Sequence, residues 1–188
     1  MPGLHGNDHR ADSKDMTDLA RLYAEIAFLR RGPQDVPASM LLLALTVVAY
    51  FAVNILVNVM LPPLPDPWFP MLLIDVLFTL AWYSTLLRLL HRQERVLQTT
   101  TAVFGYRAVL APLSIGSEWL VRRFATEQSS WQLPLTVGYA AVAVWMIAAN
   151  SRVLKAALEW SMFQCVALVL LEFIASGLLA VAIVPFPR

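Results

Sequence analysis

Charged residues and cysteine are both scarce in this chain. Only 14% of its 188 residues are Asp, Glu, Lys or Arg, whereas an ordinary soluble domain has about 25%. A chain of this composition cannot fold as a soluble globule without exposing large apolar patches to water. Its one cysteine, Cys165, excludes an intrachain disulfide framework. The net charge of +1 gives no basis for nucleic-acid binding, and we expect none.

Sequence motifs of the common enzyme classes are also missing. The chain contains no Gly-rich phosphate loop, no HExxH, no GxSxG and no CxxC. No polar segment is long enough to form a catalytic domain. We therefore expect a protein that is not an enzyme, with no catalytic residue, no metal site and no cofactor.

Long hydrophobic runs dominate what is present. Hydrophobic residues make up 59% of the sequence, and the mean hydropathy is +0.62. An α-helix needs about 20 apolar residues to cross a bilayer, and runs of this length recur along the chain. The sequence therefore predicts an all-α, polytopic transmembrane bundle over residues 38–188, with about five spans at residues 38–61, 71–90, 97–121, 131–150 and 160–184.

The N-terminal region is polar and precedes the first span. Residues 1–16 show no periodic pattern, and we expect a disordered tail there. Residues 17–37 are predicted to form a short cytoplasmic amphipathic helix and a linker, because apolar residues follow helical spacing at Leu19, Leu22, Tyr23, Ile26 and Leu29. Two interpretations of this apolar stripe are open: it lies on the membrane surface or the bundle, or it binds a partner.

The segment 97–121 is the least apolar of the five. Arg107 lies at its centre, where a charged residue costs about 2.5–3.5 kcal/mol, and Pro112 interrupts its backbone hydrogen bonds. An arrangement of four spans, in which this segment does not cross, fits the distribution of Lys and Arg slightly better, but the difference does not decide between the two. We favour five spans with a central third span, because a segment outside the membrane would leave its apolar side chains without a burial site.

Charges in the loops indicate the orientation. Arg88, His91, Arg92 and Arg95 form a basic cluster between the second and third spans. Because cytoplasmic loops carry the excess of Lys and Arg, we expect this cluster and the N-terminus in the cytoplasm and the C-terminus in the periplasm. Arginine outnumbers lysine by 12 to 2, which favours a bacterial protein of the inner membrane.

Ionisable and amide residues inside the spans predict a polar centre. By helix rise, Arg107 and Glu172 lie at about the same depth and Asp75 enters from the outer side; only one of the two carboxylates need pair with the arginine. Asn54 and Asn58 share a helix face, and we expect them to form hydrogen bonds between helices. Such a centre is either a structural ion pair or a path for a proton, ion or small solute.

A short motif in the third span resembles one in a known family. The stretch FGYRAVLAP, with Gly105, Tyr106 and Pro112, resembles the Gly-Tyr…Pro pattern in the third span of Yip1-like membrane proteins, and the five-span plan is similar. The resemblance implies packing and kink positions at these three residues and no catalytic residue. The chain lacks the Asp-Leu-Tyr-Gly-Pro type of motif that the eukaryotic branch carries before its first span.

These observations lead to two functional hypotheses. The first is a non-enzymatic scaffold or adaptor for a membrane complex, which would contact lipid and another membrane protein or a second copy of itself. The alternative is a small transporter or channel subunit that uses Asp75, Arg107 and Glu172.

Overall fold

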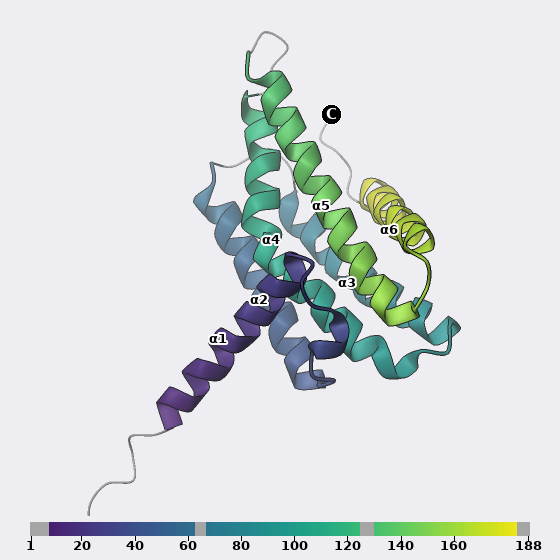
Figure 1. Cartoon of the computed structure of the whole chain (residues 1–188). Helices are drawn as coiled ribbons and strands as arrows, with labels where there is room; N and C mark the ends of the chain where they lie inside the picture. Colours follow the sequence, from purple (N-terminus) through teal and green to yellow (C-terminus); the bar gives the residue numbers. More distant parts are fainter. Residues whose placement is uncertain (1–7, 63–66, 125–129, 184–188) are drawn as a thin grey trace, which may run out of the picture.

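The structure is a computed structural model that describes residues 8–62, 67–124 and 130–183. Within these ranges the chain forms helices joined by short connections, and no strand is present. The prediction of an all-α fold is therefore confirmed (Figure 1). The helices are α1 (Asp8–Ala27), η1 (Pro33–Asp35), α2 (Met40–Met60), α3 (Trp68–Leu89), η2 (Gln93–Arg95), α4 (Val96–Phe124), α5 (Gln132–Leu158) and α6 (Met162–Ile183).

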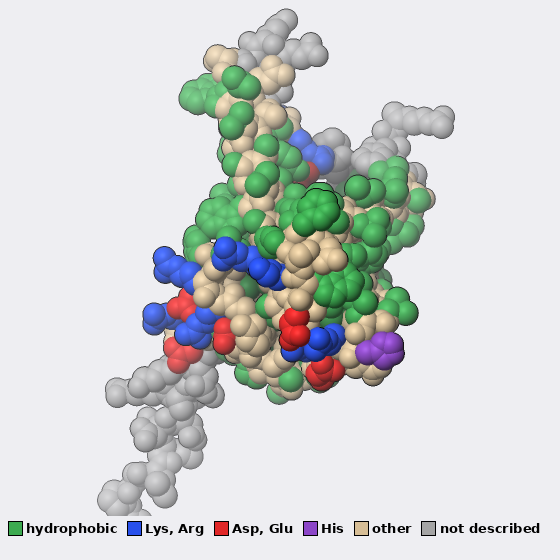
Figure 2. Space-filling view, turned by 45° about the vertical axis from the view of Figure 1, so that its right-hand side comes forward, with side chains coloured by type: hydrophobic (Ala, Val, Ile, Leu, Met, Phe, Trp, Pro, Cys, Tyr) green, Lys and Arg blue, Asp and Glu red, His purple; other side chains and the backbone are tan. Residues whose placement is uncertain are grey.

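Four of these helices, α2, α3, α5 and α6, are long and apolar enough to cross a membrane. They expose many large hydrophobic side chains, such as Leu56, Val144 and Phe163. An apolar surface of this extent suits lipid and not water, so the fold is compatible with an integral membrane protein. In Figure 2, charged side chains gather over the lower part of the visible face, and hydrophobic side chains cover most of the part above.

Helix α4 lies in the middle of the bundle, in contact with α1, α2, α3 and α5 (Figure 1). Its 29 residues are enough to span a bilayer, but it is too polar to be among the four apolar helices. Residues 99–107 are all buried. The part of α4 that carries Arg107 is thus surrounded by protein, in agreement with the central position predicted for segment 97–121.

Helix α1 begins earlier than predicted. It starts at Asp8 and not at Thr17, so the expectation of a disordered tail over residues 1–16 is wrong for residues 8–16; residues 1–7 lie outside the described ranges. Extending an existing helix costs far less than nucleating one, and the added segment contains good helix formers such as Ala, Arg and Lys. Figure 1 shows the beginning of α1 extending away from the bundle.

The second half of α1 packs on the bundle. Leu22 and Ile26 are buried in the main hydrophobic core, and the Tyr23 hydroxyl hydrogen-bonds to Thr46 Oγ1 of α2 at 2.8 Å. The indole N–H of Trp145 on α5 donates to the carbonyl of Ala27, the last residue of α1, at 2.8 Å. Of the two interpretations of the apolar stripe, packing on the bundle is correct for these residues.

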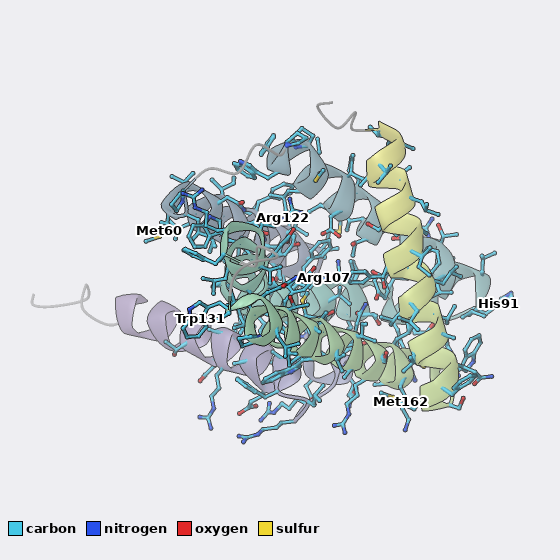
Figure 3. All side chains as sticks on the ribbon, turned by 90° about the horizontal axis from the view of Figure 1, so that it is seen from above. Met60, His91, Arg107, Arg122, Trp131 and Met162 are labelled. Atoms are coloured by element: carbon cyan, nitrogen blue, oxygen red, sulfur yellow. The ribbon has the colours of Figure 1, made fainter. Side chains whose placement is uncertain are left out.

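Helix α6 crosses its neighbours at a steep angle. It is foreshortened in Figure 1 and is seen along its length beside α5 in Figure 3. Its contacts with α3 and α5 bury Cys165, Val169 and Glu172, whose spacing of four and three residues places them on one helix face. This face carries Glu172 into the interior of the bundle.

Candidate functional site

Arg107 of α4 is the centre of a buried ionic network. Its Nη2 donates a hydrogen bond to Glu172 Oε1 of α6 at 2.8 Å, and its Nη1 donates to Thr79 Oγ1 of α3 at 2.9 Å. Asp75 Oδ1, one helical turn before Thr79, is 3.5 Å from Nη1. In Figure 3, Arg107 lies among the helices near the middle of the bundle. The structure therefore brings Arg107 between both carboxylates and not beside one alone.

Glu172 is the carboxylate of this network that is shielded from solvent. Its side chain is 3% exposed, and its Oε2 accepts hydrogen bonds from Tyr83 Oη at 2.8 Å and from Asn150 Nδ2 at 2.9 Å. Together with Arg107 these donors satisfy both carboxylate oxygens, as a buried charge requires. The sequence analysis did not identify Tyr83 and Asn150 as partners of Glu172. The sequence marks each of them only as a polar side chain within an apolar segment.

Asp75 is held less tightly than Glu172. Its side chain is 33% exposed, and Oδ2 accepts a hydrogen bond from the Tyr50 hydroxyl at 3.0 Å. Its contact with Arg107, at 3.5 Å, is longer than the 2.8 Å contact between Arg107 and Glu172. One carboxylate of the centre is therefore saturated by protein donors, and the other has room for a further partner.

A cavity of about 300 Å³ lies between α2, α3 and α4. Its lining residues Pro62, Trp68 and Arg122 lie at helix ends, whereas Tyr50 and Asp75 lie nearer the middle of their helices. The cavity therefore reaches from one end of the bundle to the polar centre. The spacing of residues along single helices does not predict it, because it is formed by side chains of three different helices.

Asn54 and Asn58 line this cavity, but the expected hydrogen bonds between helices are not formed. The Asn54 side chain donates to the Tyr50 carbonyl at 2.8 Å, and the Asn58 side chain donates to the Asn54 carbonyl at 2.9 Å. Each amide thus bonds to the preceding turn of α2, as polar side chains in helices do when no donor or acceptor of another helix is within reach. The two residues line the same cavity, as their predicted shared helix face allows, but the predicted hydrogen bonds to other helices are wrong.

The three residues of the FGYRAVLAP motif have different surroundings. Gly105 lies under Tyr23 of α1, and a Cβ at this position would overlap the tyrosine ring. Tyr106 is buried in the main core. Pro112 is exposed, and α4 continues through it to Phe124. The close approach of α1 and α4 therefore explains why residue 105 is a glycine. Pro112 does not end α4.

Only part of the predicted basic cluster is available to bind a partner, because two of its arginines form ion pairs within the protein. Arg92 and Arg95 form ion pairs with Glu159 at 3.0 and 2.7 Å, and Arg95 also donates to two carbonyls at the end of α5. The hydrogen bond from Arg95 and the charge of Arg92 lower the pKa of the Glu159 carboxyl. Two of the four residues thus hold the corner between α5 and α6, while Arg88 and His91 are exposed.

Comparisons with known proteins do not assign this chain to a family. No family model, no curated protein and no solved structure matches this chain. The similarity to Yip1-like proteins is therefore a proposal that rests on the motif at Gly105, Tyr106 and Pro112. Within the described ranges, no three His, Cys, Asp or Glu side chains are grouped so that they could hold a metal ion.

Proposed function

We propose that this protein is a bacterial inner-membrane protein that binds a small polar solute in the cavity between α2, α3 and α4, as a small transporter or channel subunit. The observation that carries the proposal is the partly exposed Asp75 carboxylate at the inner end of this cavity. An ionisable residue within a membrane span is expensive and typically marks a pathway or binding site. The cavity gives this carboxylate access to solute.

The unequal surroundings of the two carboxylates support solute binding over a purely structural ion pair. A pair that only fixes helix positions is best kept dry and saturated, as Glu172 is. Asp75 faces the cavity and lies 3.5 Å from Arg107. Because Arg107 has a shorter contact with Glu172, it keeps a partner when Asp75 binds a solute.

The distribution of basic residues supports a cavity that opens toward the periplasm. Arg30, Arg31, Arg88 and Arg152 lie toward the end of the bundle opposite the cavity mouth. By the positive-inside rule this end is cytoplasmic. The same orientation leaves the end of α6 on the periplasmic side.

Uptake into proteoliposomes tests the proposal. The full chain is reconstituted, and uptake is measured for four labelled solutes of different charge: glucose, alanine, choline and succinate. We expect one class to accumulate above empty liposomes, and Asp75→Asn to abolish that uptake. Glu94→Gln, which neutralises an exposed carboxylate on η2, is the matched control and should transport normally. Failure of every class to bind or accumulate would contradict the proposal.

An adaptor role is the second candidate, and it is favoured by the beginning of α1, which extends away from the bundle (Figure 1). Leu22 and Ile26 are core residues, so a partner would have to use the helix before them. Removing residues 1–20 is then expected to abolish recovery of a membrane partner after crosslinking while the bundle still inserts. Unchanged recovery of the same partner would exclude this role for the helix.

A further inference from the structure

We propose that the solute held between α2, α3 and α4 is a small organic cation that carries an ammonium group. The inference rests on the proposed function, because it names the chemical class for the same cavity. Three features of the cavity support it: an excess of negative charge, hydrogen-bond acceptors that lack a donor, and aromatic walls.

Charge is the first feature. At the cavity wall, Glu118 and Arg122 form an ion pair at 2.6 Å and neutralise each other. Behind the cavity, the single guanidinium of Arg107 contacts two carboxylates, Asp75 and Glu172. One negative charge is therefore in excess, and Asp75 is the member that faces the cavity. Next to this carboxylate, a solute cation is favoured electrostatically over a neutral or anionic solute.

Hydrogen-bond acceptors are the second feature. The amide nitrogens of Asn54 and Asn58 both donate to carbonyls of α2, so each residue has its side-chain oxygen left to accept. Among the described residues no hydrogen bond is formed to the side-chain oxygen of Asn54, a residue that is 7% exposed and lines the cavity. This oxygen is not one of the fully buried side-chain atoms that lack a partner, so it can accept a hydrogen bond from a solute in the cavity. Polarised C–H or N–H groups next to a cationic nitrogen would satisfy it.

Aromatic rings are the third feature. Tyr50, Trp68 and Trp119 line the cavity. The indole N–H of Trp119 already donates to the Pro62 carbonyl at 3.0 Å, so this residue offers the solute its ring and not its donor. The faces of tryptophan and tyrosine rings attract cations, and aromatic walls are the common way to recognise substituted ammonium groups.

The size of the cavity points to an organic cation and not to a bare metal ion. Its volume of about 300 Å³ corresponds to roughly ten water molecules at about 30 Å³ each. A solute of about that many non-hydrogen atoms would fill it. Because the Glu118 carboxylate is paired with Arg122, the cavity offers one further carboxylate, two amides and three rings, a poor ligand set for divalent metals, which require more oxygen ligands.

Equilibrium binding to the full chain in nanodiscs tests this inference, with labelled choline as the probe. We expect saturable binding that tetramethylammonium displaces, while the uncharged choline isostere 3,3-dimethylbutanol and potassium displace it at least about tenfold less well. Asp75→Asn should weaken binding by about tenfold or more, and Trp119→Leu by about two- to tenfold, from the loss of one cation–π contact. Glu94→Gln should bind as the unchanged chain does.

The outcomes separate this inference from the proposed function. If the uncharged isostere or potassium competes as well as tetramethylammonium, selection for an organic cation is wrong. If choline does not bind but glucose, alanine or succinate does, the cation is wrong and solute binding stands. If no class binds, both fail. Should Asp75→Asn not fold, Trp119→Leu decides, and undiminished choline binding by this variant would overturn the assignment of the cavity.

Discussion

Replacing Gly105 by alanine is expected to destabilise the protein only while Tyr23 is present. Gly105 lies where α1 packs on α4, and an added Cβ would overlap the Tyr23 ring, including its Cγ atom. Because Cγ lies on the χ2 axis, rotation of the ring cannot relieve the overlap. Either the tyrosine moves away from α4 or the whole of α1 detaches.

The magnitudes decide between these responses. Overpacking in a core costs about 1–3 kcal/mol. Detaching α1 would expose Leu22 and Ile26, each worth about 1.5–3 kcal/mol. It would also break the hydrogen bond between Tyr23 and Thr46, worth about 0.5–1.5 kcal/mol. Overpacking is the smaller cost, so we expect α1 to stay in place and the free energy of unfolding to fall by about 1–3 kcal/mol.

A double-mutant cycle tests the reasoning. In a Tyr23→Ala background, the added methyl group has room, and alanine is a better helix former than glycine by about 0.8–1.0 kcal/mol. Gly105→Ala should therefore stabilise the protein in that background and destabilise it otherwise. Reversible unfolding by SDS in detergent micelles, followed by circular dichroism, measures all four variants. An effect of the same sign and size in both backgrounds would refute the close contact with Tyr23.

Three further predictions concern the rest of the molecule. Glu172→Gln is expected to lower the free energy of unfolding by about 3–5 kcal/mol, because the buried arginine loses its nearest charged partner; SDS unfolding measures the change, and unaltered stability would contradict it. Asn58→Cys, in a chain with Cys165→Ala, is expected to react with a membrane-impermeant maleimide added from the periplasmic side, and complete protection would mean that the cavity is closed to water. The hydrogen bond from Arg95 lowers the pKa of Glu159 below its ordinary value of 4.5, so the α5–α6 corner should be intact above that pH and lose this interaction as the pH falls through the lowered pKa. An NMR titration of this carboxyl with a midpoint at or above 4.5 would refute the pairing.

The ends of the most apolar helices were predictable from the sequence. Helices α2 (Met40–Met60) and α6 (Met162–Ile183) begin and end within two residues of the predicted spans 38–61 and 160–184, because runs of bilayer length have few alternative positions. Helix α5 was predicted less well. It continues to Leu158, beyond the predicted end at residue 150, because its last two turns are amphipathic and pack on protein, which hydropathy alone does not detect.

The sequence by itself determined that the chain is an all-helical bundle suited to lipid and that Arg107 and Glu172 share a depth within it. Hydropathy and helix rise are properties of single segments, so they can be evaluated without knowing the neighbours. Only the tertiary structure decided that Asn54 bonds to its own helix, that Gly105 lies under Tyr23 and that a cavity opens beside the polar centre. Those features depend on how far each helix is rotated about its axis and on which distant segment packs against it.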